Sequence, residues 1–392
     1  MTSLNDVCLL IEDCLHSTAT TVDTGYPVIR TPNIGKGRLL LDNVDRVTKQ
    51  VYDERNIRAI PQTNDLILAR EASAGNVAII KEGQTVCLGQ RTVLIRPNPV
   101  QVNPSYLCYY LLAPTQQYNL LGTANGATVP HVNMSTIRTL KLDLPPITIQ
   151  NMVAETISSY DDLIENNQKQ IKLLEEAAAR LYKEWFVDLR FPGYETTKFV
   201  DGLPEGWANA CFNDICVLVK DCVSPKDILP NTPYIGLEHM PRKSICLNEW
   251  IDASIVNSNK FIFRVNDILF GKIRPYFHKV GFAQVDGVAS TDAIILRAKQ
   301  DMFGLLLMTA SSDVFVKYTY TTCKEGSKMP RADWDEMKAY RILIPDPKVL
   351  KMFDEQIRLM TQMIKTKSMQ SLSLCQARDK LLPKLMSGEI EV

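Results

Sequence analysis

A segment near the N-terminus is written a second time in the middle of the chain. LNDVCLLIEDC, from Leu4 to Cys14, corresponds to FNDICVLVKDC, from Phe212 to Cys222, with six of eleven positions identical. Further matches follow in the same order, at offsets that fall from 208 to 200: Asn64–Leu68 with Asn266–Phe270, Gly126-x-x-x-Pro130 with Gly326-x-x-x-Pro330, and Leu144-Pro145 with Ile344-Pro345. Because loop insertions change an offset in small steps, we infer that one unit of about 200 residues is present twice.

A repeat of this length is domain-sized and too long for a solenoid, so two related domains are expected. Apolar residues make up 45% of the chain and charged residues 22%, which is enough to give each copy a buried core. Each copy opens with short β-branched and aromatic runs, such as residues 65–69 and 293–296, with helical stretches such as 104–112 between them. The sequence therefore predicts two α+β domains related by an approximate two-fold repeat.

Each copy closes with a long helical segment whose apolar residues alternate at spacings of four and three, the period of a coiled-coil seam. The first seam spans residues 153–185, which is about 50 Å of helix. Its polar position is Asn167, whereas Lys367, Ser371 and Arg378 weaken the second seam. The apolar seam positions are Val153, Ile157, Tyr160, Ile164, Ile171, Leu174, Leu181 and Trp185, and Phe353, Ile357, Met360, Ile364, Leu374, Leu381 and Leu385.

Two arrangements of these helices are open. Each could pack on its own domain, as most amphipathic helices do. Their length exceeds what one domain needs across its core, however, so we expect them to pair antiparallel as a coiled coil and to hold the domains apart. The predicted boundaries are a first domain at 1–146, a first helix at 147–190, a linker at 191–202, a second domain at 203–346, and a second helix with the C-terminal tail at 347–392.

Composition excludes several classes of protein. The 44 basic residues are balanced by 44 acidic ones, which argues against a simple nucleic-acid coat. The ten cysteines form no paired CxxC motifs and histidine is scarce, so reduced thiols in a cytoplasm are expected and a zinc site is not. No basic segment precedes an apolar run at the N-terminus, and no apolar stretch is long enough to span a membrane.

Several short segments of the sequence resemble segments found in one known family. Residues 64–78 (NDLILAREASAGNVA) and 266–276 (NDILFGKIRPY) resemble the strand-loop-strand segments of two classes of target recognition domain. Residues 126–131 (GATVPH) and 326–331 (GSKMPR) resemble the loop that precedes the long helix. In the order, spacing and duplication of these segments, essentially the whole chain resembles the specificity (S) subunits of type I restriction-modification systems.

The resemblance implies a non-catalytic subunit without a cofactor of its own. In that family each recognition domain reads one part of a split sequence of double-stranded DNA, while the helices fix the gap and dock two methyltransferase (M) subunits. Restriction (R) endonuclease and translocase subunits join in the full enzyme, so S-adenosylmethionine, ATP and Mg would belong to the partners. A specificity subunit of a related type II restriction-modification system is the alternative.

Cationic and amide side chains in loops are the expected DNA contacts, because Arg can bond guanine and Asn can bond adenine bidentately, whereas Lys grips phosphate. The candidates are Arg30, Asn33, Lys36, Arg38, Arg70, Ser73 and His131 in the first domain, and His239, Arg242, Lys243, Lys272, Arg274, Tyr276, Lys328 and Arg331 in the second. Each could equally be a solvated surface group. The 272–276 segment and the 326–331 loop are favoured, because several cations meet turn residues there.

Two other functions fit parts of the sequence. The segment Asn103-Pro104-Ser105-Tyr106 resembles the Asn-Pro-Pro-Tyr loop of amino-methyltransferases, which would make the chain a stand-alone adenine DNA methyltransferase. The second proline is absent, and a helix that starts at Pro104 explains the segment as well. A coiled-coil adaptor that binds no nucleic acid would show no salt-sensitive binding to a duplex.

Overall fold

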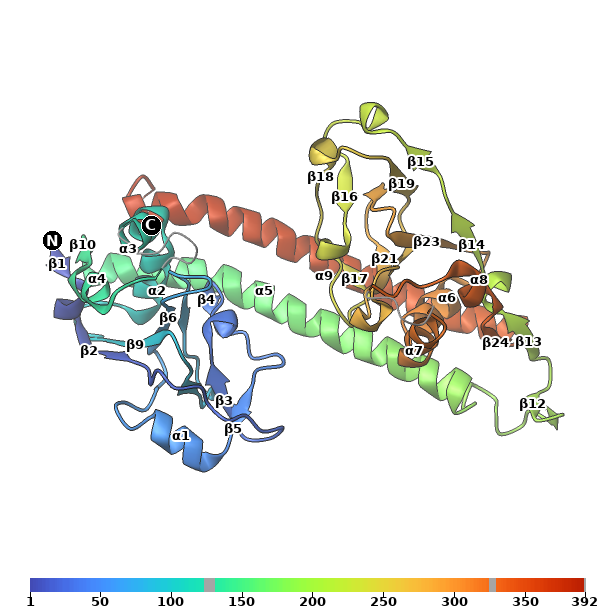
Figure 1. Ribbon diagram of the computed structural model, residues 1–392, viewed down its shortest axis with the longest axis horizontal. Helices are drawn as coiled ribbons and strands as arrows, with labels where there is room; N and C mark the ends of the chain where they lie inside the picture. The colour runs from blue at the N-terminus through green and yellow to red at the C-terminus, as the bar shows by residue number, and fades with distance from the viewer. Residues whose placement is uncertain (123–130, 324–328, 391–392) are drawn as a thin grey trace. The chain divides into compact units, whose positions relative to one another are not determined.

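The computed structural model describes residues 1–122, 131–323 and 329–390 (Figure 1). The chain divides into two compact units: unit 1 comprises Met1–Asp162 with Leu374–Val392, and unit 2 comprises Leu163–Ser373. Helices α5 (Ile147–Tyr182) and α9 (Pro347–Ser387) each contribute one part to unit 1 and the other part to unit 2. Within these described ranges, no helix combines the length and the apolar character that crossing a membrane requires.

Unit 1 is built on a five-stranded sheet in the order β2-β9-β6-β7-β4, antiparallel except for the parallel pair β4 and β7. Alternate residues of β6 face opposite sides, so Ile67 is buried with the small sheet β5-β3-β8 and Leu66 is buried beneath α2. The elements are β1 (Thr2–Ser3), η1 (Leu4–Val7), β2 (Cys8–Asp13), β3 (Tyr26–Ile29), η2 (Thr31–Asn33), β4 (Gly37–Arg38), β5 (Arg46–Val47), α1 (Lys49–Arg55), β6 (Leu66–Ala69), β7 (Val77–Ile79), β8 (Cys87–Leu88), β9 (Thr92–Pro97), α2 (Pro104–Leu112), α3 (Pro114–Leu121), α4 (Met134–Thr139) and β10 (Lys141–Leu142).

Unit 2 repeats this plan with the sheet order β14-β23-β20-β21-β17, in which β17 and β21 are the parallel pair. Its second sheet is larger, with the order β15-β19-β22-β16-β18. The strands are β11 (Phe199–Val200), β12 (Leu203–Pro204), β13 (Ala208–Cys211), β14 (Cys216–Val219), β15 (Cys222–Val223), β16 (Pro233–Ile235), β17 (Cys246–Leu247), β18 (Ile251–Asp252), β19 (Lys260–Phe263), β20 (Ile268–Gly271), β21 (Val280–Ala283), β22 (Gly287–Ala289), β23 (Ala293–Ala298) and β24 (Arg341–Ile344). The α-helices between these strands are α6 (Phe303–Ala310), α7 (Asp313–Thr321) and α8 (Trp334–Ala339), and the short helical turns include η6 (Leu237–His239) and η8 (Pro275–Phe277).

One ion pair on a buried aspartate occurs in both units at the same place in the sheet. Asp65 accepts two hydrogen bonds from Arg96, at 2.8 and 2.7 Å, and Asp267 accepts two from Arg297 at the same distances. Both carboxylates are 2% exposed, and each follows an asparagine with a left-handed backbone (φ 71° and 70°). The repeat seen in the sequence is therefore a repeat of three-dimensional structure.

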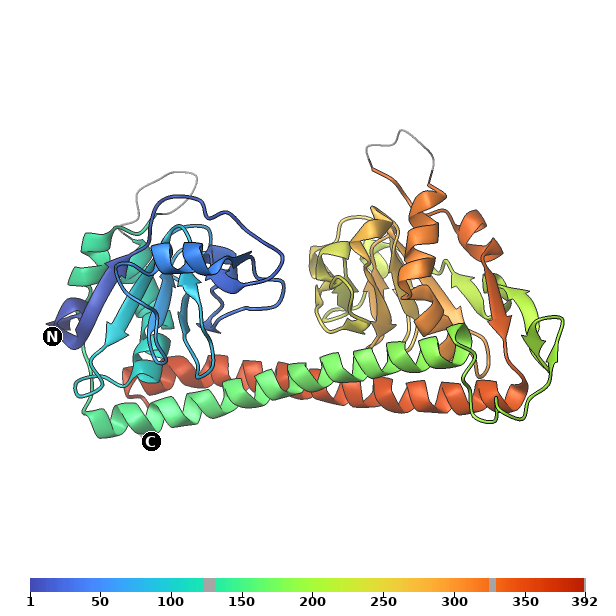
Figure 2. The same ribbon diagram turned by 90° about the horizontal axis from the view of Figure 1, so that it is seen from below.

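The two long helices pair within unit 1, where the start of α5 meets the end of α9 (Figure 2). Ile157 shares a buried core with Leu385. Nη1 of Arg378 donates to Asp161 at 2.5 Å, and the hydroxyl of Tyr109 donates to the same carboxylate at 2.7 Å. This ion pair compensates Arg378, one of the polar positions in the second seam.

In unit 2 the end of α5 meets the start of α9. The five-residue π-helical turn Lys183–Val187 follows α5, and the rings of Trp185 and Phe186 lie 5.6 and 4.7 Å from that of Phe353. Opposite ends of the helices meet in both units, so the pair is antiparallel. The predicted α+β class, internal repeat and antiparallel helix pair are confirmed.

None of the fifteen apolar seam positions is exposed, and Asn167 is buried with them. The buried ones are Val153, Ile157, Ile164, Ile171, Trp185, Phe353, Ile357, Ile364 and Leu385; the half-buried ones are Tyr160, Leu174, Leu181, Met360, Leu374 and Leu381.

Candidate nucleic-acid interface

In unit 1, Arg70 and His131 lie together in a hydrogen-bonded network with two carboxylates. The guanidinium of Arg70 donates to Asp13 (Nη1 to Oδ2, 2.7 Å) and to the carbonyl of Val132 (2.9 Å), and its Nη2 lies 2.8 Å from Nε2 of His131. Nδ1 of His131 lies 2.7 Å from Oε1 of Glu71. Arg70 is 7% exposed, so it braces the loop after β6 and does not present a free guanidinium to a base.

The loop between β6 and β7 carries Ser73, which is exposed and has a left-handed backbone (φ 87°). Farther along this loop, Nδ2 of Asn76 donates to the carbonyl of Ile34 at 2.9 Å. This bond ties the loop to the segment that holds the remaining candidates of unit 1.

That segment runs from Arg30 to Arg38. Nη1 of Arg30 forms an exposed ion pair with Asp45 at 2.6 Å, and its backbone N–H donates to Oδ1 of Asn33 at 3.1 Å. Lys36 is exposed, whereas Arg38 is half-buried in β4. The structure therefore brings six of the seven candidates of unit 1 into two linked loops, with His131 joined through Arg70.

In unit 2, backbone pairing brings Lys272, Arg274 and Arg331 together. Ile273 forms an isolated β-bridge with Arg331, and the N–H of Arg274 donates to the carbonyl of Pro330 at 2.8 Å. Lys272 and Arg331 also line one side of a cavity of about 710 Å³. These are the positions that correspond to Arg70 and His131 of unit 1.

The cations of this loop in unit 2 are less compensated than those of unit 1. Arg331 is exposed and lies 3.8 Å from Asp292. Among the residues that the structure describes, no ion pair joins Arg274 to a carboxylate, and its Nε is buried without a hydrogen-bond partner. Tyr276 is exposed beside them. This cluster has the open cationic character that DNA contacts require.

Arg242 belongs to the same surface, because its guanidinium carbon lies 4.0 Å from the ring centroid of Phe277. His239 does not, since its Nδ1 accepts the N–H of Gly236 at 2.9 Å and closes a turn. Lys328 lies outside the described residues.

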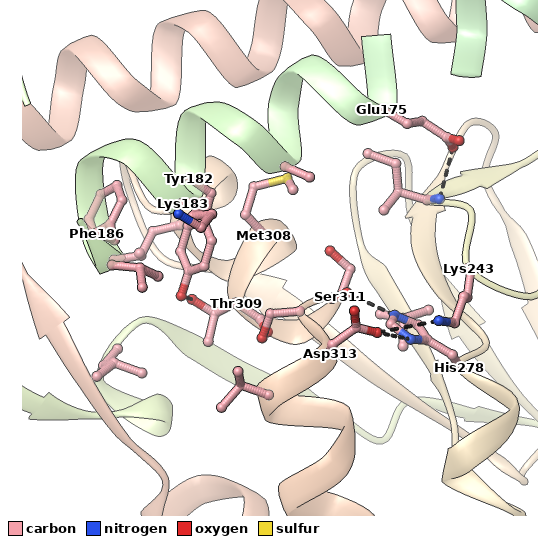
Figure 3. A pocket seen from close by; sticks show the side chains of 18 of the residues that line it. Glu175, Tyr182, Lys183, Phe186, Lys243, His278, Met308, Thr309, Ser311 and Asp313 are labelled. Atoms are coloured by element: carbon pink, nitrogen blue, oxygen red, sulfur yellow. Dashed lines mark hydrogen bonds and ion pairs between the residues drawn. The ribbon is translucent and has the colours of Figure 1, made fainter. Parts of the chain in front are cut away.

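Lys243 stands at the edge of a different feature, a cavity of about 890 Å³ (Figure 3). Its Nζ lies 3.7 Å from Asp313, which also approaches Nδ1 of His278 at 3.3 Å. On the α5 side of this cavity, the carboxylate of Glu175 accepts hydrogen bonds from the N–H groups of Ile245 and Cys246 at 2.9 and 3.1 Å. Here α5 is attached to the sheet of unit 2, and burial raises the pKa of the Glu175 carboxyl.

The segment that resembles a methyltransferase loop is a helix cap. Oδ1 of Asn103 accepts the N–H of Tyr106 at 2.9 Å, Pro104 is the first residue of α2, and Tyr106 is buried. A capped helix start leaves no opening in which this segment could hold a base.

The cysteines are unlike metal ligands. Burial raises the pKa of Cys87 to about 11 and that of Cys216 to about 12, so both thiols stay protonated at neutral pH. Across the part of the chain that the structure describes, no cluster of His, Cys, Asp and Glu could hold a metal ion.

Sequence reasoning missed the side chains that decide which cations are free. In unit 1 these side chains are the carboxylates of Asp13 and Glu71. Asp13 lies 57 positions before its partner Arg70, and Glu71 lies 60 positions before its partner His131. Phe277 and Tyr320, which adjoin Arg242 and Tyr276, also went unnoticed. The adjacency of two aromatic residues to a cationic turn at 272–277 was the available signal.

Comparison with known proteins finds similarity to one family. Residues 1–176 match the family model described as type I restriction modification DNA specificity domain. The MjaIX specificity subunit of a type I restriction enzyme from Methanocaldococcus jannaschii is 25% identical over 88% of this chain and 82% of its own length. The EcoDI specificity subunit from Escherichia coli is 24% identical over 54% of this chain and 52% of its own.

A solved structure shares the fold. The type I restriction-modification S subunit from M. genitalium superposes with a TM-score of 0.59 at 15% identity, covering 98% of this chain and 95% of its own. Residues 1–176 thus match a type I restriction modification DNA specificity domain, and the chain is similar over 88% of its length to a type I specificity subunit, so the resemblance found in the sequence is confirmed. The prediction of a specificity subunit that has no catalytic role is confirmed with it.

Proposed function

We propose that this chain reads a bipartite sequence in double-stranded DNA, with residues 1–146 and 203–346 as the two target recognition domains. The observation that carries the proposal is that both units share one sheet order and one ion pair on a buried aspartate, while the loops after β6 and β20 carry different side chains. One scaffold with two sets of loops is what two different half-sequences require.

The DNA contacts we propose differ between the domains. In the first, exposed and half-buried groups of the two linked loops supply them: Arg30, Asn33, Lys36, Arg38 and Ser73, with Arg70 and His131 holding the loop in place. In the second, the open cluster supplies them: Arg242, Lys272, Arg274, Tyr276 and Arg331, with Lys328, Lys243 and His239 as further candidates.

The long helices, at 147–190 and 347–392, are proposed to fix the gap between the half-sequences, with 191–202 as the linker. A seam of about 50 Å corresponds to one to two turns of DNA at roughly 34–36 Å per turn. The bases in the gap would then be unread. The buried seam supports this proposal, because a paired helix is stiffer than a single one.

Partners are proposed from exposed apolar side chains that recur 200 residues apart on the two helices. Met152 on α5 and Met352 on α9 are both exposed, as are Leu163 and Met363. Equivalent apolar positions on a repeated structure suit two copies of one partner, which we propose are two methyltransferase (M) subunits. Restriction (R) endonuclease subunits would join this assembly in the cytoplasm, and the partners would carry S-adenosylmethionine, ATP and Mg.

Sequencing of methylated adenines in cells that express the chain with its neighbouring subunits tests the proposal. The expected result is a split motif with a gap of fixed length. A further variant adds seven residues to α5 and seven to α9 at the boundary between the units, which lengthens each helix by roughly 10 Å, about three base pairs. The gap should then lengthen while both half-sequences stay the same. An uninterrupted motif, or a gap that ignores the insertion, would contradict the proposal.

A further inference from the structure

Three aromatic side chains form a continuous cluster beside the cations of unit 2. The ring of Tyr276 lies 4.9 Å from that of Phe277 and 5.3 Å from that of Tyr320, in both cases close to edge-on (72° and 81°). The guanidinium of Arg242 covers Phe277 at 4.0 Å, and that of Arg274 is 5.9 Å away. Phe277 is thereby enclosed, whereas Tyr276 and Tyr320 are 47% and 45% exposed. The cluster therefore exposes the rings of Tyr276 and Tyr320, and the enclosed ring of Phe277 supports them.

The backbone that carries Tyr276 is strained. Turn η8 (Pro275–Phe277) lies between Arg274 and His278, and both of these have left-handed backbones, with φ of 50° and 52°. Residues other than glycine rarely adopt this conformation, and such strain persists where surrounding bonds enforce it. Here the carbonyl of Pro330 accepts the N–H of Arg274, and the N–H of Lys243 donates to the carbonyl of His278. Strain of this kind gathers at functional sites.

The repeated scaffold does not require these rings. In unit 1 the corresponding loop carries Ala74 and Gly75, and alignment of α3 with α7 from their first residues places the half-buried Leu121 at the position of Tyr320. The aromatic cluster is therefore an addition particular to unit 2.

We propose that Tyr276 and Tyr320 form an aromatic wedge that unstacks one base step in the DNA half-sequence read by unit 2. The inference rests on the proposed function, because it needs this loop to face DNA. Exposed aromatic rings stack on bases in a sequence-tolerant way, and neighbouring cations hold the adjacent phosphates. A partner that modifies a base must extrude it from the duplex, and a step already unstacked lowers that cost.

A protein partner is the less favoured occupant of this surface. Within the described part of the chain, no carboxylate pairs with Arg242 or Arg274, so the rings are bordered by cations without counterions. Nucleic acid supplies the opposite charge along its whole length.

The test uses the chain in complex with its methyltransferase subunit and the duplex identified by methylation sequencing. 2-Aminopurine, whose fluorescence rises when it is unstacked, replaces one base at a time across the half-sequence read by unit 2. We compare the natural chain with the double variant Tyr276→Ser/Tyr320→Ser, with Tyr276→Phe/Tyr320→Phe, and with Tyr118→Ser, which removes an exposed tyrosine from unit 1.

The wedge predicts a several-fold rise at one step with the natural chain, its loss in the serine variant, and its retention in the phenylalanine and Tyr118→Ser variants. Binding by the serine variant should weaken on the order of tenfold. Specific binding without a fluorescence change at any step would overturn the wedge and leave the proposed function standing. A serine variant that fails only to assemble with the methyltransferase would also overturn it and assign the rings to a protein partner. Absence of specific binding by the natural complex would instead refute the proposed function.

Discussion

The loops after β6 and β20 occupy the same place on the same sheet, yet they handle charge in opposite ways. In unit 1, Arg70 is buried against Asp13 and braces its loop. In unit 2, Lys272 occupies the corresponding position, beside Arg274, for which the described residues offer no carboxylate partner. The difference shows that the repeat preserves the support and leaves the loop chemistry free to differ.

The support itself is the same in both units. Asp65 with Arg96 and Asp267 with Arg297 fix the equivalent strands by bonds of equal length. The proposed reading of two unlike half-sequences needs this combination, because loops can diverge only on a sheet that does not depend on them.

The largest effect should come from breaking the shared support. Asp65→Asn and Asp267→Asn should each destabilise their own unit by about 3 kcal/mol, because each removes the charge of a buried carboxylate that accepts two charge-assisted hydrogen bonds from a half-buried arginine. Denaturant unfolding followed by hydrogen exchange within each unit measures the loss. Asp53→Asn, which removes an exposed ion pair with Lys49, is the control and should leave the free energy of unfolding nearly unchanged. If the free energy of unfolding falls by clearly different amounts in the two units, the two ion pairs do not stabilise their units equally.

A smaller effect should separate the two loops. Arg70→Ala should lower the free energy of unfolding of unit 1 by about 2 kcal/mol, because Asp13 and the carbonyl of Val132 lose their buried partner. Lys272→Ala should change that of unit 2 by less than about 0.5 kcal/mol. Thermal unfolding of both variants provides the comparison. If both variants lose a similar free energy of unfolding, the loops after β6 and β20 have the same structural role.

The smallest effect is one of pH and belongs to unit 2 alone. Because burial raises the pKa of Glu175, the folded state holds a proton that the unfolded state releases above about pH 4.3, so the Glu175 contribution to stability falls as pH rises from there. Glu175→Gln should remove this dependence while its amide oxygen still accepts the N–H groups of Ile245 and Cys246. The repeat places Cys375 at the corresponding position, so unit 1 should show no such change.

Unfolding curves recorded between pH 4 and 7 measure this effect, with the exposed Glu155→Gln of unit 1 as control. A pH dependence that is the same in Glu175→Gln and in the natural chain would contradict the assignment.

The features read correctly from the sequence are periodic or repeated. The repeat, the α+β class and the paired helices each rest on many residues, so a change at one position such as Arg378 does not hide the pattern. Asp161 compensates that arginine from 217 positions away, a pairing that no local pattern reveals. The same limit applies to Arg70, which looks like a DNA contact until Asp13, 57 positions earlier, is placed beside it.

Tyr276 was found because a cationic turn surrounds it, whereas Tyr320 was missed because it lies in a helix far along the chain. Backbone strain at Arg274 has no sequence signature either, since proline at the next position favours an extended residue there. Long-range packing, and not local preference, decides which candidates meet.

Methylation sequencing of the variant Lys272→Ala/Arg274→Ala, expressed with its partner subunits, tests most directly whether the two units read DNA independently. One half of the motif should become degenerate or be lost, while the other half and the gap stay as in the natural chain. Equal loss of preference in both halves would show that the units do not act as separate readers.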